Sequence, residues 1–290
     1  MKNTIIKNYL NEDSLRHSFN ILAKKTFDGL NFEPWYQNGY WSDRYNPYSI
    51  VIDGEIAANV SVNLMDFMWN GERKHFIQLG TVMTDERFRN QGLIRQIMNE
   101  IDKDYGQNAD GFYLFANDSV LDFYPKFDFH KAMEYRYAKP FSTSLESRMI
   151  QIPMLDKKDW HKLESAMRQS VPYSRLNMMD NDNLIMFYVS GFMQENVYYS
   201  QEYDTYVIAD MEEDILTVHN IFSKKKYPMD DILAAFGSDV QQVILGFTPL
   251  NAEGYTASAY REDDCTLFVK GKCFDAFERD KVIFPTLSHA

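Results

Sequence analysis

The stretch from Phe76 to Asp104 constrains the fold most, because its hydrophobic periodicity changes in the middle. It begins with FIQLGTVM, a largely apolar run with β-branched residues that is typical of a strand. From Leu93 to Ile101 the apolar residues recur at helical spacing, with polar residues between them. A polar connector, residues 84–92, separates the two patterns and ends in RNQG at positions 89–92. The stretch therefore predicts a strand, a short loop and a helix with a glycine in its first turn.

A helix start of this kind suits an anion. The first backbone N–H groups of a helix have no partner within the helix, and the helix dipole adds positive potential there. A phosphate at such a terminus is held by several amides at once. Gly92 lacks a Cβ and lets the backbone approach a pyrophosphate, while Arg89 and Arg95 could add charge-assisted hydrogen bonds. The alternative is a glycine that only eases the turn from strand to helix.

The sequence of this loop carries a resemblance. Residues 89–94, RNQGLI, resemble the pyrophosphate loop of the GNAT acyltransferases, Q/R-x-x-G-x-G/A, with Ile94 at the sixth position in place of Gly or Ala. The longer run RNQGLIRQIM resembles the loop of the enhanced-intracellular-survival acetyltransferases, which are tandem GNAT folds. The resemblance implies acetyl-CoA as co-substrate and no metal.

The order of predicted elements in the first half agrees with a GNAT fold. A strand over Thr4–Leu10 and a helix from about Leu15 come first, followed by antiparallel strands. Asp53-Gly54 and Asn70-Gly71 are hairpin turn signals between these strands. We expect an α/β (α+β) protein in which residues 1–141 form a catalytic GNAT N-acetyltransferase domain, with a mixed, mostly antiparallel central sheet flanked by helices.

The second half repeats this layout after a polar linker, PFSTSLES at residues 140–147. We expect residues 142–290 to form a second, degenerate GNAT-like domain. Where the loop motif should recur, the chain has SKKKYP at residues 223–228, with neither glycine nor arginine. One CoA site per chain is therefore predicted.

The resemblance assigns candidate residues to the CoA site. Backbone groups on the strand before the loop are expected to pair with the pantetheine amides, and the loop with the pyrophosphate. The cofactor-binding candidates are Val82, Met83, Thr84, Arg89, Asn90, Gln91, Gly92, Leu93, Ile94, Arg95 and Asn117.

Tyr124 is the candidate general acid. It stands seven residues after Asn117, which matches the GNAT pattern Asn-x6-Tyr. In that family the tyrosine protonates the departing thiolate. Packing beside Phe123 and Phe127 is the alternative role. The general base stays open among Glu134, Asp66, Glu33 and a water-linked backbone carbonyl.

An aromatic segment, NFEPWYQNGYW at residues 31–41, occupies the position that lines the acceptor site in GNAT folds. Trp35, Tyr36 and Trp41 are the candidate substrate-binding residues. The alternative is a hydrophobic flap packed on the core.

Composition narrows the partners. The net charge of −12 and the lack of a long basic run argue against nucleic acid as a partner. They are compatible with a cationic amine as substrate. The two cysteines, Cys265 and Cys273, form neither a disulfide framework nor, with any His near in sequence, a zinc pattern. No segment reaches 18 apolar residues, so we expect a cytoplasmic protein without a membrane partner. The composition is also compatible with a homo-oligomer.

These observations predict an acetyl-CoA-dependent N-acetyltransferase that acts on a primary amine of a small molecule or peptide, by direct transfer. The alternative is a non-catalytic acyl-CoA-binding or regulatory module. A nucleotide-phosphate protein is disfavoured because the chain has no Walker lysine after the glycine and no GxGxxG.

Overall fold

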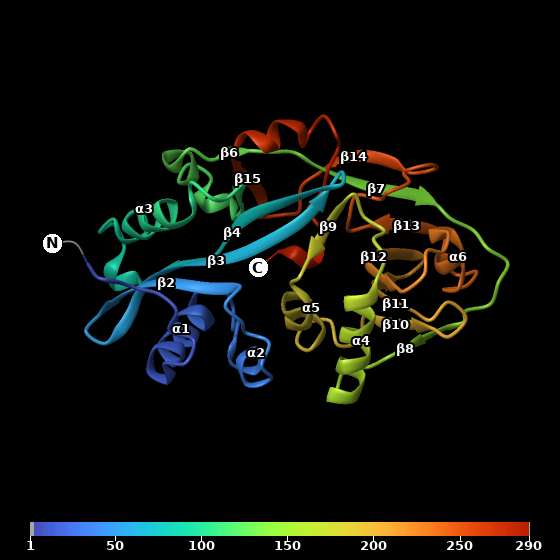
Figure 1. Cartoon of the computed structure of the whole chain (residues 1–290), viewed down its shortest axis with the longest axis horizontal. Helices are drawn as coiled ribbons and strands as arrows, with labels where there is room; N and C mark the ends of the chain where they lie inside the picture. The colour runs from blue at the N-terminus through green and yellow to red at the C-terminus, as the bar shows by residue number, and fades with distance from the viewer. Residues whose placement is uncertain (1–2, 290) are drawn as a thin grey trace.

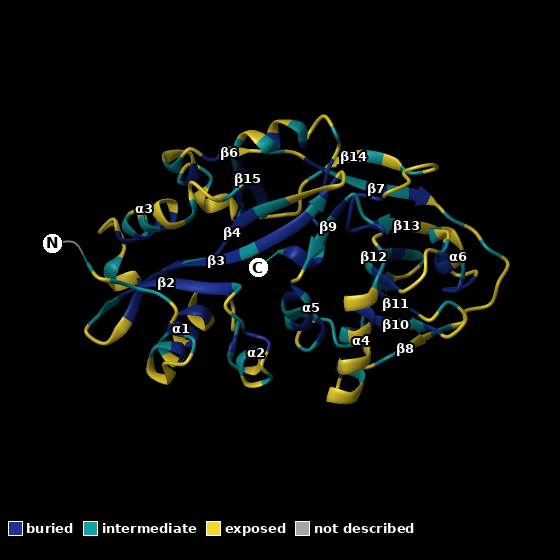
Figure 2. Ribbon diagram, viewed as in Figure 1, coloured by how far each residue is buried: buried dark blue, intermediate teal, exposed yellow. Residues whose placement is uncertain are grey.

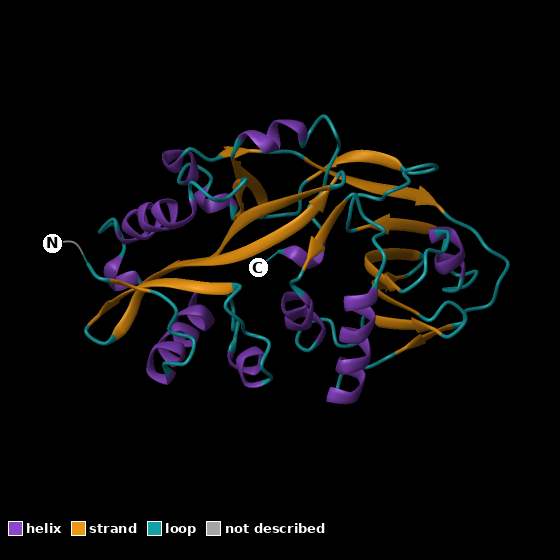
Figure 3. Ribbon diagram, in the orientation of Figure 1, coloured by secondary structure: helices purple, strands orange, loops and turns teal. Residues whose placement is uncertain are grey.

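The computed structural model describes residues 3–289, which form two open, mostly antiparallel sheets with helices against their faces (Figures 1 and 3). The mixed α/β class predicted from the sequence is confirmed. The helices are α1 (Asp13–Thr26), α2 (Glu33–Gln37), α3 (Leu93–Tyr105), α4 (Lys157–Gln169), α5 (Asp182–Val189) and α6 (Met229–Ala234).

The first sheet has the strand order β1-β2-β3-β4-β5-β15-β6, and β9 pairs with the far end of β3. Its strands are β1 (Ile5–Ile6), β2 (Tyr45–Ile52), β3 (Glu55–Trp69), β4 (Glu72–Thr84), β5 (Gly111–Ala116), β6 (His130–Lys131), β9 (Leu176–Met179) and β15 (Thr266–Lys270). The predicted hairpin turns are confirmed: Asp53-Gly54 joins β2 to β3 and Asn70-Gly71 joins β3 to β4, all four residues with positive φ.

The second sheet has the order β14-β7-β13-β12-β11-β10-β8. Its strands are β7 (Glu134–Pro140), β8 (Met149–Gln151), β10 (Val197–Ser200), β11 (Thr205–Glu212), β12 (Ile215–Ser223), β13 (Gln242–Leu245) and β14 (Thr256–Tyr260). The strands β11 and β12 are joined through the acidic segment at residues 212–214, with Glu213 in the left-handed conformation.

The chain exchanges strands between the sheets. β7 precedes the linker yet pairs with β13 and β14 in the second sheet, whereas β15 comes from the end of the chain and pairs with β5 and β6 in the first. In Figure 1 the linker runs as an extended green segment around the outer edge of the second sheet. The division into domains at residues 141 and 142 stays a prediction, and any such domains share these two strands.

Each face of the first sheet carries its own core. Apolar residues of α3 pack with one face of β2, β3 and β4, and α1 and α2 pack on the other face. The core around α1 and α2 continues into the second half through α4, α5, β10 and β11. Figure 2 shows the resulting burial of β3, the long strand at the centre of the molecule. This shared core fixes α5 opposite α2.

The sequence VLDFYPKF at residues 120–127 predicts a helix after β5, and the structure differs from this prediction. The segment forms two 3₁₀ turns, Asp118–Val120 and Tyr124–Phe127, joined by other turn residues. Pro125 lacks the N–H that a helix needs, and Asp128 leaves with φ 67°, so a longer helix is interrupted on both sides.

Candidate active site

The central strands of the first sheet separate midway along their length. β4 and β5 pair in parallel only from Phe76 to Gln78, opposite Gly111 to Tyr113. Beyond that point the register of β3 and β4 shifts, and Thr81 on β4 takes φ 47°. This bulge bends β4 away from β5. The edge of β4 from Leu79 to Thr84 is therefore unpaired with β5 and lines a cavity.

The helix start lies where the loop predicts it. Gly92 is the N-cap of α3 with φ 72°, and a Cβ built there would have no neighbour within 4 Å. Within the described part of the chain, no side chain caps this end of α3. The first amides of the helix therefore face open space, which is the arrangement that holds a phosphate group.

Two arginines flank this helix start. The side chain of Arg89 is 60% exposed, and its nearest acidic partner, Glu86, lies 3.9 Å away. Arg95 lies over the ring of Phe127, 5.6 Å from the ring centre. Both arginines line the cavity and can turn towards an anion there.

The cavity measures about 1370 Å³. This exceeds the roughly 300–1,000 Å³ typical of small-molecule sites, and so leaves room for a cofactor together with an acceptor. The structure brings every predicted cofactor residue into its wall: Val82, Met83, Thr84, Arg89, Asn90, Gln91, Gly92, Leu93, Ile94, Arg95 and Asn117.

Asn117 has a second task. Its side-chain amide donates to the carboxylate of Asp264 at 2.9 Å and to the Asp264 carbonyl at 3.3 Å. Asp264 also accepts the backbone N–H of Asp118. Asn117 thus ties the end of β5 to the loop before β15, besides lining the cavity.

Tyr124 lies in the cavity wall and is 4% exposed. Its ring packs against Phe123, Phe129 and Phe268. Among residues 3–289 its hydroxyl has no hydrogen-bond partner. Burial raises the pKa of Tyr124 to about 12, so the phenol keeps its proton at neutral pH. A protonated hydroxyl without a protein partner is available to a bound molecule.

The predicted acceptor residues separate in the structure. Trp35 lines the cavity, and its indole N–H donates to the Asn183 carbonyl at 2.8 Å. Trp41 is buried beneath it and donates to the Tyr45 carbonyl, while Tyr36 packs against the guanidinium of Arg16. Tyr36 and Trp41 lie outside the cavity wall, because their hydrogen bonds and ring contacts belong to the core around α1.

The second half supplies part of the wall, a role that was expected of it, through residues that the sequence did not single out. Phe187 and Tyr188 of α5 and Phe192 just after it face the cavity from the side opposite α2. Phe187 stacks on Phe32, with ring centres 5.4 Å apart. The only sequence signal was a short apolar element at residues 184–192, which periodicity alone does not assign to a site.

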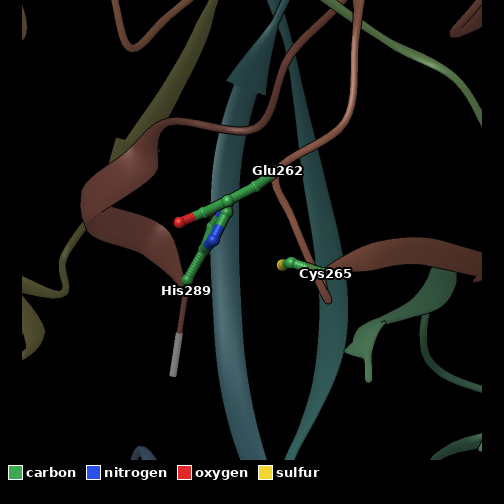
Figure 4. A group of neighbouring side chains, drawn as sticks. All are labelled: Glu262, Cys265 and His289. Atoms are coloured by element: carbon green, nitrogen blue, oxygen red, sulfur yellow. The ribbon is translucent and has the colours of Figure 1, made fainter. Parts of the chain in front are cut away.

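The end of the chain also reaches the cavity. Cys265 and His289 line it, and Glu262 lies beside them (Figure 4). Burial and the charge of Glu262 raise the pKa of the Cys265 thiol to about 12, and burial lowers the pKa of His289 to about 3. Residues 24 positions apart in sequence gave no spacing signal, so this cluster was also missed.

The three candidate bases lie elsewhere. Asp66 is bonded to Arg44, Arg73 and His75, and Glu33 is bonded to Arg16. Glu134 is buried, accepts the backbone N–H of Phe284, and has its pKa raised to about 8 by burial. The wall of the cavity contains none of the three.

Comparison with known proteins adds to this geometry. Residues 14–129 match the family model described as Acetyltransferase (GNAT) family. No curated protein matches the sequence. Among residues 3–289, no helix combines the length and the apolar run that crossing a bilayer requires.

Several solved structures share the fold over nearly the whole chain. A conserved protein of Enterococcus faecalis, described as a probable N-acyltransferase, is 15% identical with a TM-score of 0.62, over 96% of this chain and 74% of that one. A GCN5-related N-acetyltransferase from Kribbella flavida is 13% identical with a TM-score of 0.56, over 92% and 71%. Eis1 from Mycobacterium abscessus, the tandem-GNAT type, is 12% identical with a TM-score of 0.54, over 87% and 70%. The fold is thus that of tandem GNAT proteins, and residues 14–129 are similar to the GNAT acetyltransferase family.

Proposed function

We propose that the protein transfers an acetyl group from acetyl-CoA to a primary amine of a small molecule or peptide. One observation carries the proposal: a single cavity joins an uncapped helix start, an unpaired strand edge, a buried tyrosine and an aromatic wall. Each part answers one requirement of the reaction.

The pyrophosphate sits at the N-terminus of α3, where amides after Gly92 and the two flanking arginines neutralise its charge. The pantetheine lies along β4, where the bulge at Thr81 exposes backbone groups of residues 82–84 to its amides. This arrangement points the thioester towards the end of β5 and Tyr124.

The neutral amine attacks the thioester carbon, and the C–N bond forms as the C–S bond breaks. Tyr124 gives its proton to the leaving sulfur, and the attacking nitrogen loses a proton to water. The aromatic wall formed by Trp35, Phe187 and Phe192 holds the body of the acceptor and excludes water from the thioester.

The test has two stages. Calorimetry with acetyl-CoA measures binding, and a hundredfold excess over the dissociation constant should stabilise the protein by about 2–3 kcal/mol. Release of free CoA thiol is then followed with a panel of hydrophobic and polycationic amines. Binding with amine-dependent release supports the proposal. Binding without release by any amine favours an acyl-CoA-binding module, and no binding at millimolar ligand contradicts the CoA site itself.

A further inference from the structure

We propose that Glu262, Cys265 and His289 form a binding site for one zinc ion beside the cavity. The Glu262 carboxylate oxygen, the Cys265 Sγ and a ring nitrogen of His289 lie within 4.8 Å of one another. Figure 4 shows the three side chains converging, two from the loop before β15 and one from the end of the chain. Neither the family nor the proposed reaction calls for these three residues together.

The loop that carries two of the ligands is a tight turn. Glu262 and Cys265 face each other across it, and the Cys265 N–H donates to the Glu262 carbonyl at 3.2 Å. The turn is anchored from outside, because Asp264 binds Asn117 and Arg261 binds Asp118. The backbone of this turn therefore holds Cys265 and Glu262 close together without a bound ion.

The third ligand is held separately. The His289 ring stacks on Phe115, with ring centres 3.7 Å apart, and its carbonyl accepts the hydroxyl of Tyr188. Its Nε2 atom is buried and has no hydrogen-bond partner among residues 3–289. A buried polar nitrogen without a partner is costly, and binding a metal ion through a neutral imidazole removes that cost.

The other two ligand atoms are also uncommitted. Within residues 3–289, the carboxylate of Glu262 and the thiol of Cys265 have neither a hydrogen bond nor a salt bridge. Arg261, which precedes Glu262 in the sequence, is paired with Asp118 at 2.7 Å. A cation is the missing partner for this group.

The donor set selects the ion. Sulfur, imidazole nitrogen and carboxylate oxygen together suit zinc, whereas magnesium and calcium prefer oxygen ligands alone. Three protein ligands leave a fourth position of the tetrahedron for water or another small ligand. Cys265 and His289 both line the cavity, so this fourth position is accessible from it.

The experiment uses the purified full chain, stripped of metal and kept reduced with a non-thiol reductant. Calorimetry with Zn²⁺ should give one ion per chain, and Co²⁺ should give a thiolate-to-cobalt absorption band. Cys265→Ser should remove the band and weaken Zn²⁺ binding at least about a hundredfold, since loss of mere outer-shell partners already costs about 10–100-fold. Cys273→Ser is the matched control, because Cys273 is the other free cysteine and bonds the Asp110 carbonyl instead. It should leave both signals unchanged.

Glu262→Gln tests the exposed ligand without disturbing the core and should weaken Zn²⁺ binding at least tenfold. His289→Ala should weaken it as much as Cys265→Ser; a thermal melt shows whether this variant stays folded, and the two other variants decide the question if it does not. Absence of Zn²⁺ binding, binding that Cys265→Ser leaves intact, or equal binding of Mg²⁺ would each overturn the site. These measurements use the metal alone, so they do not depend on acetyl transfer.

Discussion

The two sheets of this protein share one plan but differ at the place where a cofactor could bind. Each sheet places a parallel pair near its middle, β4 with β5 in the first and β12 with β13 in the second. Each also borrows the next strand from the other half of the chain, β15 and β7 respectively. The shared strand arrangement alone therefore does not produce a cofactor-binding site.

The helix that follows the parallel pair's first strand differs between the halves. α3 has 13 residues and begins at a left-handed glycine with no side-chain cap. α6 has six residues and follows Pro228. Just before α6 the Tyr227 N–H donates to the Tyr173 hydroxyl, and the Ser223 hydroxyl donates to the Lys225 carbonyl. Among the described residues neither helix start has a side-chain cap, so the difference lies in the length of the helix, in Gly92, and in the loop before α6, whose polar groups are bonded within the second half.

The gap between the paired strands differs as well. In the first sheet the pairing of β4 with β5 stops at Gln78 and the cavity opens. In the second sheet Gly246 continues the contact by donating to the Val218 carbonyl at 2.8 Å. Thr286 fills the space beside Gly246, because a Cβ built on Gly246 would lie 2.5 Å from the hydroxyl oxygen of Thr286. Thr286, near the end of the chain, thus occupies the space beside β12 and β13 in the second sheet, whereas the space between β4 and β5 in the first sheet stays open.

The largest effect is expected for Gly92→Glu, which places bulk and negative charge at the predicted pyrophosphate site. Acetyl-CoA affinity should fall at least about a hundredfold, or about 2.7 kcal/mol. Lys225→Glu is the matched control, since it puts a carboxylate at the corresponding place in the second half and should leave affinity unchanged. Gly92→Asn keeps a residue that tolerates positive φ and should bind more weakly than the native protein but better than Gly92→Glu. Unchanged affinity in a folded Gly92→Glu protein would contradict the site.

A second effect concerns Glu134, the first residue of the strand that the first half lends to the second sheet. Burial raises its pKa from 4.5 to about 8. Between these values the unfolded chain loses the proton and the folded chain keeps it, so stability falls as the pH rises from about 4.5 to 8. Glutamine keeps an acceptor for the Phe284 N–H without ionising.

Glu134→Gln should therefore raise the free energy of unfolding more at pH 8 than at pH 5, by on the order of 2–4 kcal/mol. Urea unfolding at the two pH values measures this. Glu146→Gln, in the exposed linker, is the control and should change neither value. Parallel pH profiles for the native protein and Glu134→Gln would show that Glu134 is not buried as described.

Tyr124→Phe should lower kcat by roughly tenfold or more and leave acetyl-CoA affinity intact, because general acids contribute about 10²–10⁴-fold. The control is Tyr36→Phe, which changes a tyrosine outside the cavity wall. Because the pKa of Tyr124 is about 12, its proton is present throughout the usual assay range, and kcat should show no alkaline loss from this group below about pH 10. Unchanged turnover in Tyr124→Phe would assign the tyrosine to packing.

Phe192→Ala should give the smallest effect, on the acceptor alone. Phe192 is 65% exposed, so its truncation should barely change the melting temperature. The KM for the acceptor should rise about three- to tenfold, which corresponds to roughly 1 kcal/mol of lost apolar contact. Leu155→Ala, at 71% exposed and outside the cavity wall, is the comparison variant. An equal KM in both variants would remove the second half from the acceptor site.

Much of the first half could be predicted because its signals are local. The hairpin turns depend on Asn and Asp residues next to glycine, and the loop before α3 depends on Gly92, which takes a positive φ at this helix start without steric cost. Such signals lie within a few residues of one another. The placement of the cofactor candidates on β4 and at the start of α3 followed from these signals.

The rest depends on contacts between distant parts of the chain. No local pattern reports that β7 and β15 change sheets, because both read as ordinary short strands. Phe187 and His289 reach the cavity only through tertiary packing. Trp41 and Tyr36 were placed in the acceptor site by position in the chain, whereas burial and the cation of Arg16 hold them in the core.

The contrast between the two halves is tested most directly by the stoichiometry of acetyl-CoA binding. Calorimetric titration of the full chain should give one molecule per chain, and Gly92→Glu should reduce this to none. Two molecules per native chain, or one retained in Gly92→Glu, would contradict the account, because the second half would then hold a cofactor at a place that the structure shows filled.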